Sequence, residues 1–544
     1  MKSKKIIALA LILLIAAQCA LYALAGYAKQ YLHPDEALSL GLAQYHSANI
    51  QDNHDFFGTW HKGNYYKDYL IVNQDEVNNT QSVHENQVKN GNAPLYYFFL
   101  KFYMEFSVGS FSMMTSIVLN VMLYTLITLI IFFISKSLFE GKENKLWLAF
   151  GVTAASTFTL STLSAVLNIG VYTMNTLFIT AIIMLHVFQN EEGRPKFFIG
   201  VFSGVTVFLG ILTHYSFIVI LIALYLMFLI RYIVAKSWKN IIWYTLPILV
   251  GAGGALYVYP ESLGHIYDTL KLSELIPALS NGKGALKHAK QYLSEINKYT
   301  FHTALYIIAA IIALALIVAI IKSIVSKKNK AENEENEEKP KLLSNVITVL
   351  VPTLVFFLFY SFSTLKAELR NIYPICGLMF ILLAVLLVRI SSRAFGKIGA
   401  TALICAVIAV MVVVPVVKNM EPETMYSNRV HVVNYAESHK DIPVIYVYDS
   451  ACDNLRDDLY LLTKFEKSYI TKDWQINSHN ITNVFRKQDT SGGVIVIIND
   501  AQEHHTVLNT IMKTLKLSEL SVVERLQSAN VYYLFNNSDT VVVK

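Results

Sequence analysis

The feature that most constrains the fold of this chain is a series of long apolar runs. A helix needs roughly 20 mostly apolar residues to cross a hydrocarbon core about 30 Å thick, and about eleven segments meet this need. They lie near residues 6–26, 114–134, 146–166, 169–188, 197–213, 216–234, 241–259, 303–321, 343–362, 372–390 and 398–417. The sequence therefore predicts a polytopic α-helical membrane protein. The close pairs around 167–168 and 214–215 could each be one broken helix.

Composition agrees with a membrane protein and excludes other classes. Of the 544 residues, 54% are hydrophobic and only 15% are charged, and the mean hydropathy is +0.43. A soluble domain carries roughly 25% charged residues. The formal net charge of +6 is dispersed, and no Lys/Arg-rich run is interleaved with aromatic residues, so we exclude nucleic acid as a partner. The four cysteines lie far apart and predict no disulfide framework.

Basic residues in the loops predict the orientation of the helices. They concentrate in every second loop, beginning with three lysines before the first apolar run. Because such loops resist translocation, we expect a multi-pass protein of the cell membrane with a cytoplasmic N-terminus. The outer segments then include a long first loop, 27–113, and everything after the last apolar run. A cleaved signal peptide is the alternative for the first run.

Composition also divides the chain into parts. Residues 1–417 form the predicted transmembrane domain, in which 326–341 is a charged, low-complexity linker on the cytoplasmic side. After this domain, β-type runs alternate with helix-like stretches; they lie at 444–448, 494–498 and 531–535. We therefore predict a small extracytoplasmic α/β domain at 418–544, and we expect it to dock an acceptor or to be structural.

Two adjacent acids follow the first apolar run directly. The stretch "LHPDEA" places Asp35 and Glu36 just past its outer end, in a loop too long to be a plain connection. One interpretation is helix capping, because Pro34 and two acids suit the first turn of a helix and its macrodipole. The other is acid–base chemistry, since a carboxylate can take a proton from a hydroxyl group.

Three further polar or aromatic motifs fall on the same predicted face of the membrane. "NAPLYYFFLKFYM", at 92–104, is an aromatic segment suited to the membrane interface. His214 and Tyr215 separate two apolar runs near the outer surface, where polar groups are functional or form turns. Lys366 and Arg370 lie in a short outer loop, where cations are disfavoured, and an anionic ligand such as phosphate is one reason for them.

These motifs together resemble a known family. "HPDEA", "APLYYFFLKFYM", "LTHYSF" and "LRNIYP" are similar to motifs of the GT-C superfamily of polyprenyl-phosphate-sugar-dependent glycosyltransferases, among them bacterial relatives of protein O-mannosyltransferases and aminoarabinose transferases. The resemblance covers residues 1–417. It implies a GT-C type fold with interfacial helices in the first outer loop, and transfer of a sugar from a lipid-phosphate donor to an acceptor hydroxyl, with inversion.

The resemblance also implies roles for individual residues. Asp35 matches the catalytic base of the family and Glu36 its supporting neighbour. We expect Arg370 and Lys366 to bind the donor phosphate, whose growing charge needs fixed cations. The family's acid and Arg near Tyr172 are replaced here by Asn168 and Gly170, so Lys101 or Arg370 is expected to supply the missing cation if the donor is the same. Candidate substrate-binding residues are His33, Tyr96, Tyr97, Tyr172, His214, Tyr215 and Tyr373.

Cofactors and alternatives complete the prediction. We expect no required cofactor, although a divalent cation is possible because His33, His61 and His84 share a loop with the two acids; their spacing matches no metal motif.

Expected partners are membrane lipids, the polyprenyl-phosphate-sugar donor, and a protein, glycolipid or envelope-polymer acceptor. The alternative functions are a transporter or lipid flippase of cell-envelope glycolipids and a membrane-anchored binding protein. The identity of the sugar and of the acceptor stays open.

Overall fold

The structure, a computed structural model, describes residues 2–47, 49–53, 55–191, 196–271, 273, 282–327, 338–363, 367–448, 455–499, 504–525 and 529–536. Most of the predicted linker 326–341 lies outside these residues. The chain divides into two compact units, which we describe separately. The membrane unit comprises Met1–Tyr27, Gly91–Tyr96 and Ile117–Thr424, and the sheet unit comprises Ala28–Asn90, Tyr97–Ser116 and Met425–Lys544.

The membrane unit is built from helices that coincide with the predicted apolar runs. They are α1 (Lys2–Ala28), α6 (Met113–Leu138), α7 (Lys145–Thr157), α8 (Leu160–Leu167), α9 (Tyr172–Gln189), α10 (Lys196–Ile211), α11 (Phe217–Val234), α12 (Trp238–Val258), α16 (Leu305–Lys327), α17 (Glu338–Phe362) and α18 (Leu369–Val417). Between α12 and α16 lie α13 (Ser262–Thr269), α15 (Gly282–Glu295) and the π-helical turn η4 (Ile296–Thr300).

Length and hydropathy divide these helices into three groups. Within the described residues, 7 helices are long and apolar enough to cross a membrane, or up to 9 if each bent pair counts as one span. The pairs bend by 58° between α7 and α8 and by 96° between the α15–η4 segment and α16. α10 and Thr401–Val417 are shorter apolar helices. The predicted class, a polytopic helical membrane protein with a small α/β part, is confirmed.

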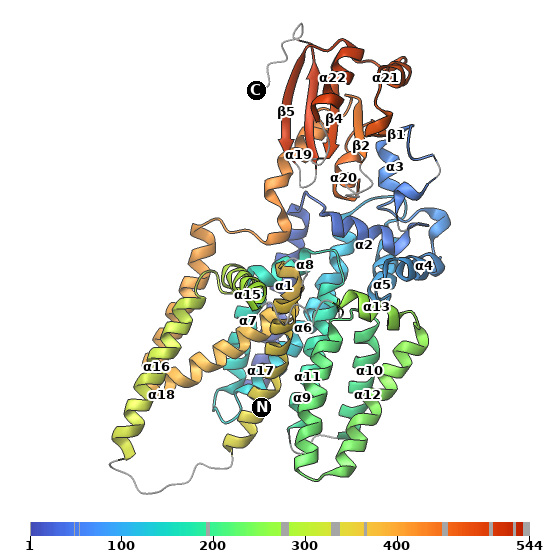
Figure 1. Cartoon of the computed structure of the whole chain (residues 1–544). Coiled ribbons are helices and arrows are strands. Elements are labelled where there is room, and N and C mark those ends of the chain that lie inside the picture. Colours follow the sequence, from blue (N-terminus) through green and yellow to red (C-terminus); the bar gives the residue numbers. More distant parts are fainter. Residues whose placement is uncertain are drawn as a thin grey trace. The chain divides into compact units, whose positions relative to one another are not determined.

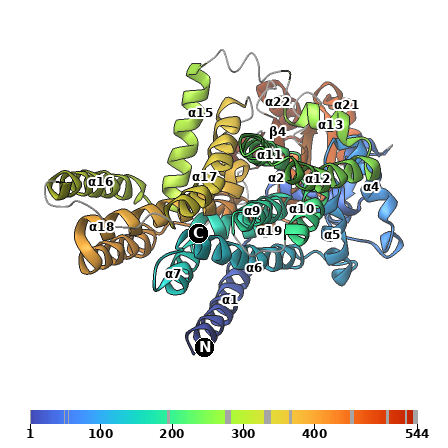
Figure 2. The same cartoon turned by 90° about the horizontal axis from the view of Figure 1, so that it is seen from below.

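Glycines explain two local features of the membrane unit. The backbones of α10 and α12 approach closely because Gly251 faces the carbonyl oxygen of Gly204, where a Cβ atom would not fit. The long helix α18 is interrupted at Gly396, whose φ of 70° is accessible to glycine at little cost. Figure 2 shows α9, α10 and α12 as one group of helices and α16 beside α18.

The sheet unit contains one mixed six-stranded sheet. Its strands are β1 (Trp60–Lys62), β2 (Val444–Tyr448), β3 (Lys467–Lys472), β4 (Val494–Asn499), β5 (Glu519–Arg525) and β6 (Ala529–Phe535), in the order β1-β3-β2-β4-β6-β5. β2 is parallel to β3 and β4, and the other pairs are antiparallel. The predicted runs at 444–448, 494–498 and 531–535 are β2, β4 and β6, which are central strands.

Several short helices follow the last membrane helix. They are η5 (Glu423–Met425), α19 (Ser427–Ser438), α20 (Leu455–Leu462), η6 (Asp473–Gln475), α21 (Ser478–Phe485) and α22 (His504–Leu515). Side chains of β2 and β4, such as Val447 and Val496, pack against Phe485 of α21 and Ile511 of α22 in a buried core. Figure 1 shows α21 and α22 next to the strands.

The first outer loop contributes its own strand to this sheet. Trp60 of β1 pairs with Tyr469 of β3, and its indole Nε1 donates a hydrogen bond to the carbonyl oxygen of Val484 (3.2 Å). The Trp60 ring also packs on the rings of Tyr469 and Phe485. The α/β domain expected at 418–544 is thus extended by residues of the loop 27–113.

The other elements described in the first loop are short helices. It contains α2 (Pro34–Gln44), η1 (Ile50–Asp52), α3 (Gly63–Asp68), η2 (Gln74–Glu76), α4 (Thr80–Asn90), α5 (Leu95–Met104) and η3 (Glu105–Ser107). Two buried amides of α4 hold the end of α2: Asn86 Nδ2 donates to the carbonyl of Tyr45 (2.7 Å) and Gln87 Nε2 to that of Leu42 (3.0 Å). α2 also packs against α20. These contacts fix the helix that carries Asp35 and Glu36.

Candidate functional site

The acid pair of "LHPDEA" opens α2, and a capping box starts the helix. Pro34 is the first helical residue and His33 is the N-cap. The backbone N–H of Asp35 donates to His33 Nδ1 (3.3 Å), and the N–H of His33 donates to Glu36 Oε2 (2.9 Å). These bonds satisfy donors that every helix N-terminus leaves unpaired. The capping interpretation therefore applies to Glu36.

Glu36 has a second partner that the motif itself does not reveal. Its Oε1 accepts a short hydrogen bond from Lys29 Nζ, and the two side chains are 1% and 0% exposed. Burial lowers the pKa of Lys29, and the Glu36 carboxylate opposes that shift. Removing two charges from water is expensive unless they are paired and hydrogen-bonded, as they are here. Both carboxylate oxygens of Glu36 thus take part in interactions that stabilise the start of α2.

Asp35 has a different environment although it is the next residue. Its side chain is 45% exposed, and its Oδ2 lies 3.6 Å from His33 Nδ1. In this arrangement the contact is no ion pair, because Nδ1 accepts the N–H of Asp35 and therefore carries no proton. Two adjacent carboxylates in unlike surroundings suit different tasks. Asp35 is thus partly exposed to solvent, whereas Glu36 is buried.

An aromatic residue that is distant in sequence contacts the start of α2. The Tyr426 ring stacks on His33 with ring centres 4.9 Å apart, and Lys29 Nζ lies 5.8 Å from its centre. Tyr426 also contacts Tyr31 edge to face (5.7 Å). His33 therefore contacts both the start of α2 and the Tyr426 ring.

Lys101, a predicted phosphate-binding cation, is buried on α5. Its side chain is only 2% exposed, and among the described residues its Nζ has no hydrogen-bond partner. Burial lowers the pKa of Lys101, and the nearby carboxylates of Glu76 and Glu105 oppose the shift. An ammonium group in this position is costly and needs an anion close by. Glu76 is one such anion.

In the membrane unit, the structure brings together three of the predicted substrate-binding residues. Tyr172 lies at the start of α9, with its ring centre 6.1 Å from that of His214 and 6.3 Å from that of Tyr373. His214 Nδ1 contacts Ser216 Oγ (2.8 Å), which accepts a hydrogen bond from Asn175 (2.9 Å). Burial lowers the pKa of His214 to about 4, so the imidazole is neutral at pH 7.

Arg370 stands in the first turn of α18 with an acidic neighbour. Its guanidinium forms an ion pair with Glu368, and its side chain is 16% exposed. In the same turn, the hydroxyl of Tyr373 donates a hydrogen bond to Glu423 Oε2 (3.2 Å). Basic and acidic groups thus surround the start of α18, where Arg370 can bind an anion.

Glu423 is a site residue that the sequence motifs did not indicate. Burial and the nearby Glu295 raise the pKa of Glu423 to about 7, while the Tyr373 hydrogen bond and Arg370 oppose the shift. A carboxyl group that titrates near neutral pH can exchange protons, which is frequent at functional sites. The signal was available, because "EPE" at 421–423 repeats the Pro-acid pattern of "HPDEA" just past an apolar run. Lys29 gave a similar signal, a cation at the predicted outer end of the first run.

Three of the remaining predicted residues are buried, and the fourth is not described. Tyr215 is buried in an apolar cluster with Ala93 and Leu270. Tyr96 and Tyr97 are buried on α5. Lys366 lies outside the described residues.

Metal-binding geometry is not found in the described ranges. Within them, no three His, Cys, Asp or Glu side chains come together in an arrangement that could hold an ion. Two donors expected there have other partners: Glu36 pairs with Lys29, and His61 Nε2 contacts the carbonyl oxygen of Phe56 (2.7 Å). Glu36 and His61 are therefore engaged in contacts within the protein.

Comparison with known proteins gives matches only at the level of solved structures. No protein-family model and no curated protein matches this sequence. The crystal structure of ArnT from Cupriavidus metallidurans bound to undecaprenyl phosphate is 11% identical, with 96% of this chain and 97% of that chain covered and a TM-score of 0.45. Its apo structure is 10% identical over the same shares, with a TM-score of 0.47.

A second group of matches is archaeal. The Archaeoglobus fulgidus oligosaccharyltransferase in complex with Zn and sulfate is 10% identical, covering 85% of this chain and 67% of that chain, with a TM-score of 0.42. The matched proteins are thus an oligosaccharyltransferase and ArnT. At these identities and scores, the likeness assigns no residue and no substrate.

Proposed function

We propose that this protein is an integral membrane glycosyltransferase that moves a sugar from a polyprenyl-phosphate donor to an acceptor hydroxyl on the outer face of the membrane. The observation that carries the proposal is that the two adjacent carboxylates at the start of α2 differ in burial. Glu36 is buried against Lys29, and Asp35, in the same helical turn, is 45% exposed. A backbone held by the helix cap together with a partly exposed carboxylate supports Asp35 as the residue that meets the acceptor.

Asp35 is the proposed general base. An acceptor hydroxyl is a weak nucleophile until a carboxylate takes its proton in the transition state, a contribution of roughly 10²–10⁴ in rate. Asp35 suits this task because its carboxylate is in contact with solvent, and because the cap and the Glu36–Lys29 pair hold its backbone still. Positioning of this kind matters, since displacement of a catalytic group by about 1 Å can cost about 10²-fold in rate.

Arg370 is the proposed ligand of the donor phosphate. When the glycosidic bond breaks, negative charge grows on the lipid phosphate, and a fixed cation stabilises that charge. Arg370 can present two parallel N–H groups to phosphate oxygens. Its ion pair with Glu368 holds the guanidinium in place before the donor binds and must rearrange or be shared when it does. Of the described candidates it is better exposed than Lys101, at 16% against 2%.

The proposed reaction is a single displacement. The acceptor oxygen forms a bond to the anomeric carbon while its proton passes to Asp35, and the bond from that carbon to the phosphate oxygen breaks. The polyprenyl phosphate leaves with the bonding electron pair. Because no covalent enzyme intermediate forms, the anomeric configuration is inverted. The acceptor can be a protein, a glycolipid or an envelope polymer.

A cell-based comparison tests the proposal before the sugar is identified. Envelope glycans and glycoproteins are analysed by mass spectrometry in cells that carry the normal protein, no protein, Asp35→Asn or Asp75→Asn. Asp75 is a matched control, since it is an exposed acid of the same loop in the 3-10 helix η2. We expect Asp35→Asn to lose the same glycan as the cells without the protein, and Asp75→Asn to keep it. An unchanged glycan profile in cells without the protein would refute the proposal.

A further inference from the structure

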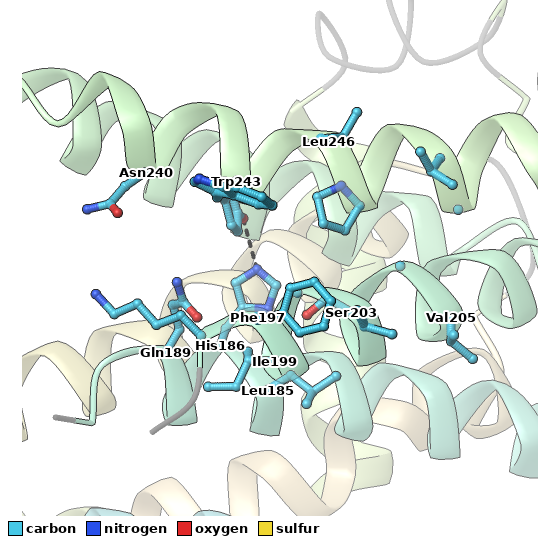
Figure 3. Close-up of a pocket in the computed structure, with 18 of the residues that line it drawn as sticks. Leu185, His186, Gln189, Phe197, Ile199, Ser203, Val205, Asn240, Trp243 and Leu246 are labelled. Atoms are coloured by element: carbon cyan, nitrogen blue, oxygen red, sulfur yellow. Dashed lines mark hydrogen bonds between the residues drawn. The ribbon is translucent and has the colours of Figure 1, made fainter. Parts of the chain in front are cut away.

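The membrane unit also has a groove that none of the candidate site residues lines. It is formed by α9, α10 and α12 and has a volume of about 870 Å³, within the range of roughly 300–1,000 Å³ typical of ligand pockets. Figure 3 shows its two walls, with Trp243 and Leu246 on one side and Phe197 and Val205 on the other.

The groove is also lined by His186, and both of its ring nitrogens form hydrogen bonds within the protein. His186 Nδ1 donates to the carbonyl oxygen of Ile182 (2.8 Å), and its Nε2 accepts from the Tyr244 hydroxyl (2.8 Å). Both ring nitrogens are therefore occupied, so this histidine is available neither as a metal ligand nor as a catalytic base. The dashed line in Figure 3 marks the bond to Tyr244.

The two ends of the groove differ in chemistry. One end lies where α9 ends and α10 and α12 begin, and it is lined by four polar residues, Gln189, Lys196, Lys239 and Asn240. Figure 3 shows Gln189 and Asn240 at this end, with Val205 at the opposite end. Further along, the lining is apolar and includes Val201, Val205, Leu246 and Val250, and glycines of both helices add little side-chain bulk. The groove is thus amphipathic along its length.

Both cations at the polar end are available to a ligand. Lys196 and Lys239 are exposed, and among the described residues neither has an ion pair or side-chain hydrogen bond. The loop charges predict that this end faces the cytoplasm, where the leaflet is rich in anionic lipids. Basic pockets between membrane helices on that side bind anionic headgroups.

We propose that this groove binds one anionic phospholipid, with an acyl chain along Val201, Val205 and Val250 and the phosphate headgroup against Lys196 and Lys239. Charge complementarity selects the occupant. An uncharged lipid offers no anion to the two lysines, and the phosphate of a zwitterionic lipid is already balanced by the cation of its own headgroup, whereas an anionic lipid brings net negative charge. The lipid bridges the helices α10 and α12, whose backbones meet at Gly204 and Gly251. This proposal does not depend on the reaction assigned to the protein.

Native mass spectrometry of the full-length protein in mixed micelles tests this proposal. The lipids offered are phosphatidylglycerol, phosphatidylethanolamine and undecaprenyl phosphate. A double variant, Lys196→Gln/Lys239→Gln, is compared with Lys4→Gln/Arg393→Gln, which removes two exposed cations of the same predicted side outside the groove. At about 1 kcal/mol per cation, we expect the first pair to weaken phosphatidylglycerol binding roughly thirtyfold and the control pair to leave it unchanged.

A second variant tests the apolar part of the groove. Val205→Trp fills it, whereas Ile222→Trp changes an exposed position of α11 that does not line it. We expect only Val205→Trp to displace the bound phospholipid. The proposal is overturned if phosphatidylglycerol and phosphatidylethanolamine bind equally, if undecaprenyl phosphate is the lipid retained, or if the lysine variants bind phosphatidylglycerol like the normal protein.

Discussion

The buried ion pair of Lys29 and Glu36 gives the sharpest test of how α2 is held. Both side chains are nearly inaccessible, and Glu36 also accepts the N–H of His33 through its other oxygen. Removing one partner of a buried pair leaves an uncompensated charge, which costs about 3–5 kcal/mol. Lys29→Met and Glu36→Gln should therefore each destabilise the sheet unit by this amount.

The double variant should behave differently. Lys29→Met/Glu36→Gln removes both charges, and the glutamine oxygen can still accept the His33 N–H, so the cap survives. Replacing a buried pair by uncharged groups of similar volume is often neutral or stabilising. We therefore expect the double variant to regain most of the loss, with a coupling energy of several kcal/mol in the mutant cycle.

Thermal unfolding of the purified protein measures this effect. For a folded unit of 150–250 residues, 1 kcal/mol shifts the melting temperature by about 2–4 °C, so each single variant should melt roughly 6–20 °C lower at a fixed scan rate. Sugar transfer should follow the same pattern, because a loosened α2 misplaces Asp35. Additive losses in the double variant would refute the reasoning, since they would mean that the two groups do not compensate each other.

The other predictions concern the cap, the donor phosphate and one carboxyl group. His33→Ala should cost about 1 kcal/mol of stability, whereas His33→Asn keeps a cap and should cost less, as thermal unfolding will show. Arg370→Ala should raise the donor KM at least about tenfold in a transfer assay, and an unchanged KM would move the phosphate role elsewhere. Because its pKa is raised to about 7, Glu423 keeps a proton in the folded state that the unfolded chain releases above about 4.5. The stability from this group is therefore present at low pH and lost as pH rises from about 4.5 to 7. Glu423→Gln should match the stability of the normal protein at about pH 5 and exceed it at about pH 8 by roughly 1–3 kcal/mol, measured by thermal unfolding at both pH values.

Long apolar runs made the membrane helices predictable, but the breaks between them depend on local chemistry. The sequence indicated a break near 167–168, and α8 does end at Leu167. It did not indicate the bend before α8. There Thr159 accepts the N–H of Thr162 through its side chain and starts a new helix, a signal too short to separate from an apolar run.

Pairing over long distances limited the prediction of the sheet. β1 has three residues, and its partner Tyr469 lies about 400 positions away, so nothing local to Trp60 reveals the strand. The apolar runs of β2, β4 and β6 did reveal central strands, since both faces of such strands are buried or partly buried. β5 carries charges at both ends and was not predicted for that reason.

Contacts that the sequence pattern does not reveal also limited the prediction of the candidate site. "HPDEA" correctly indicated a cap, and its Asp and Glu could be named from the pattern. Their different environments could not, because they depend on Lys29 folding back onto Glu36 and on Tyr426 stacking on His33. Both contacts are set by tertiary packing.

The most direct test of the proposed reaction is the release of polyprenyl phosphate by the reconstituted protein. The normal protein and Asp35→Asn are supplied with a membrane-lipid extract of the source cells, and free polyprenyl phosphate is quantified together with the sugar transferred. The account predicts release in a one-to-one ratio with sugar transfer, and a loss of at least about 10²-fold in Asp35→Asn with donor binding retained. Equal release by both proteins, or sugar transfer without it, would contradict the account.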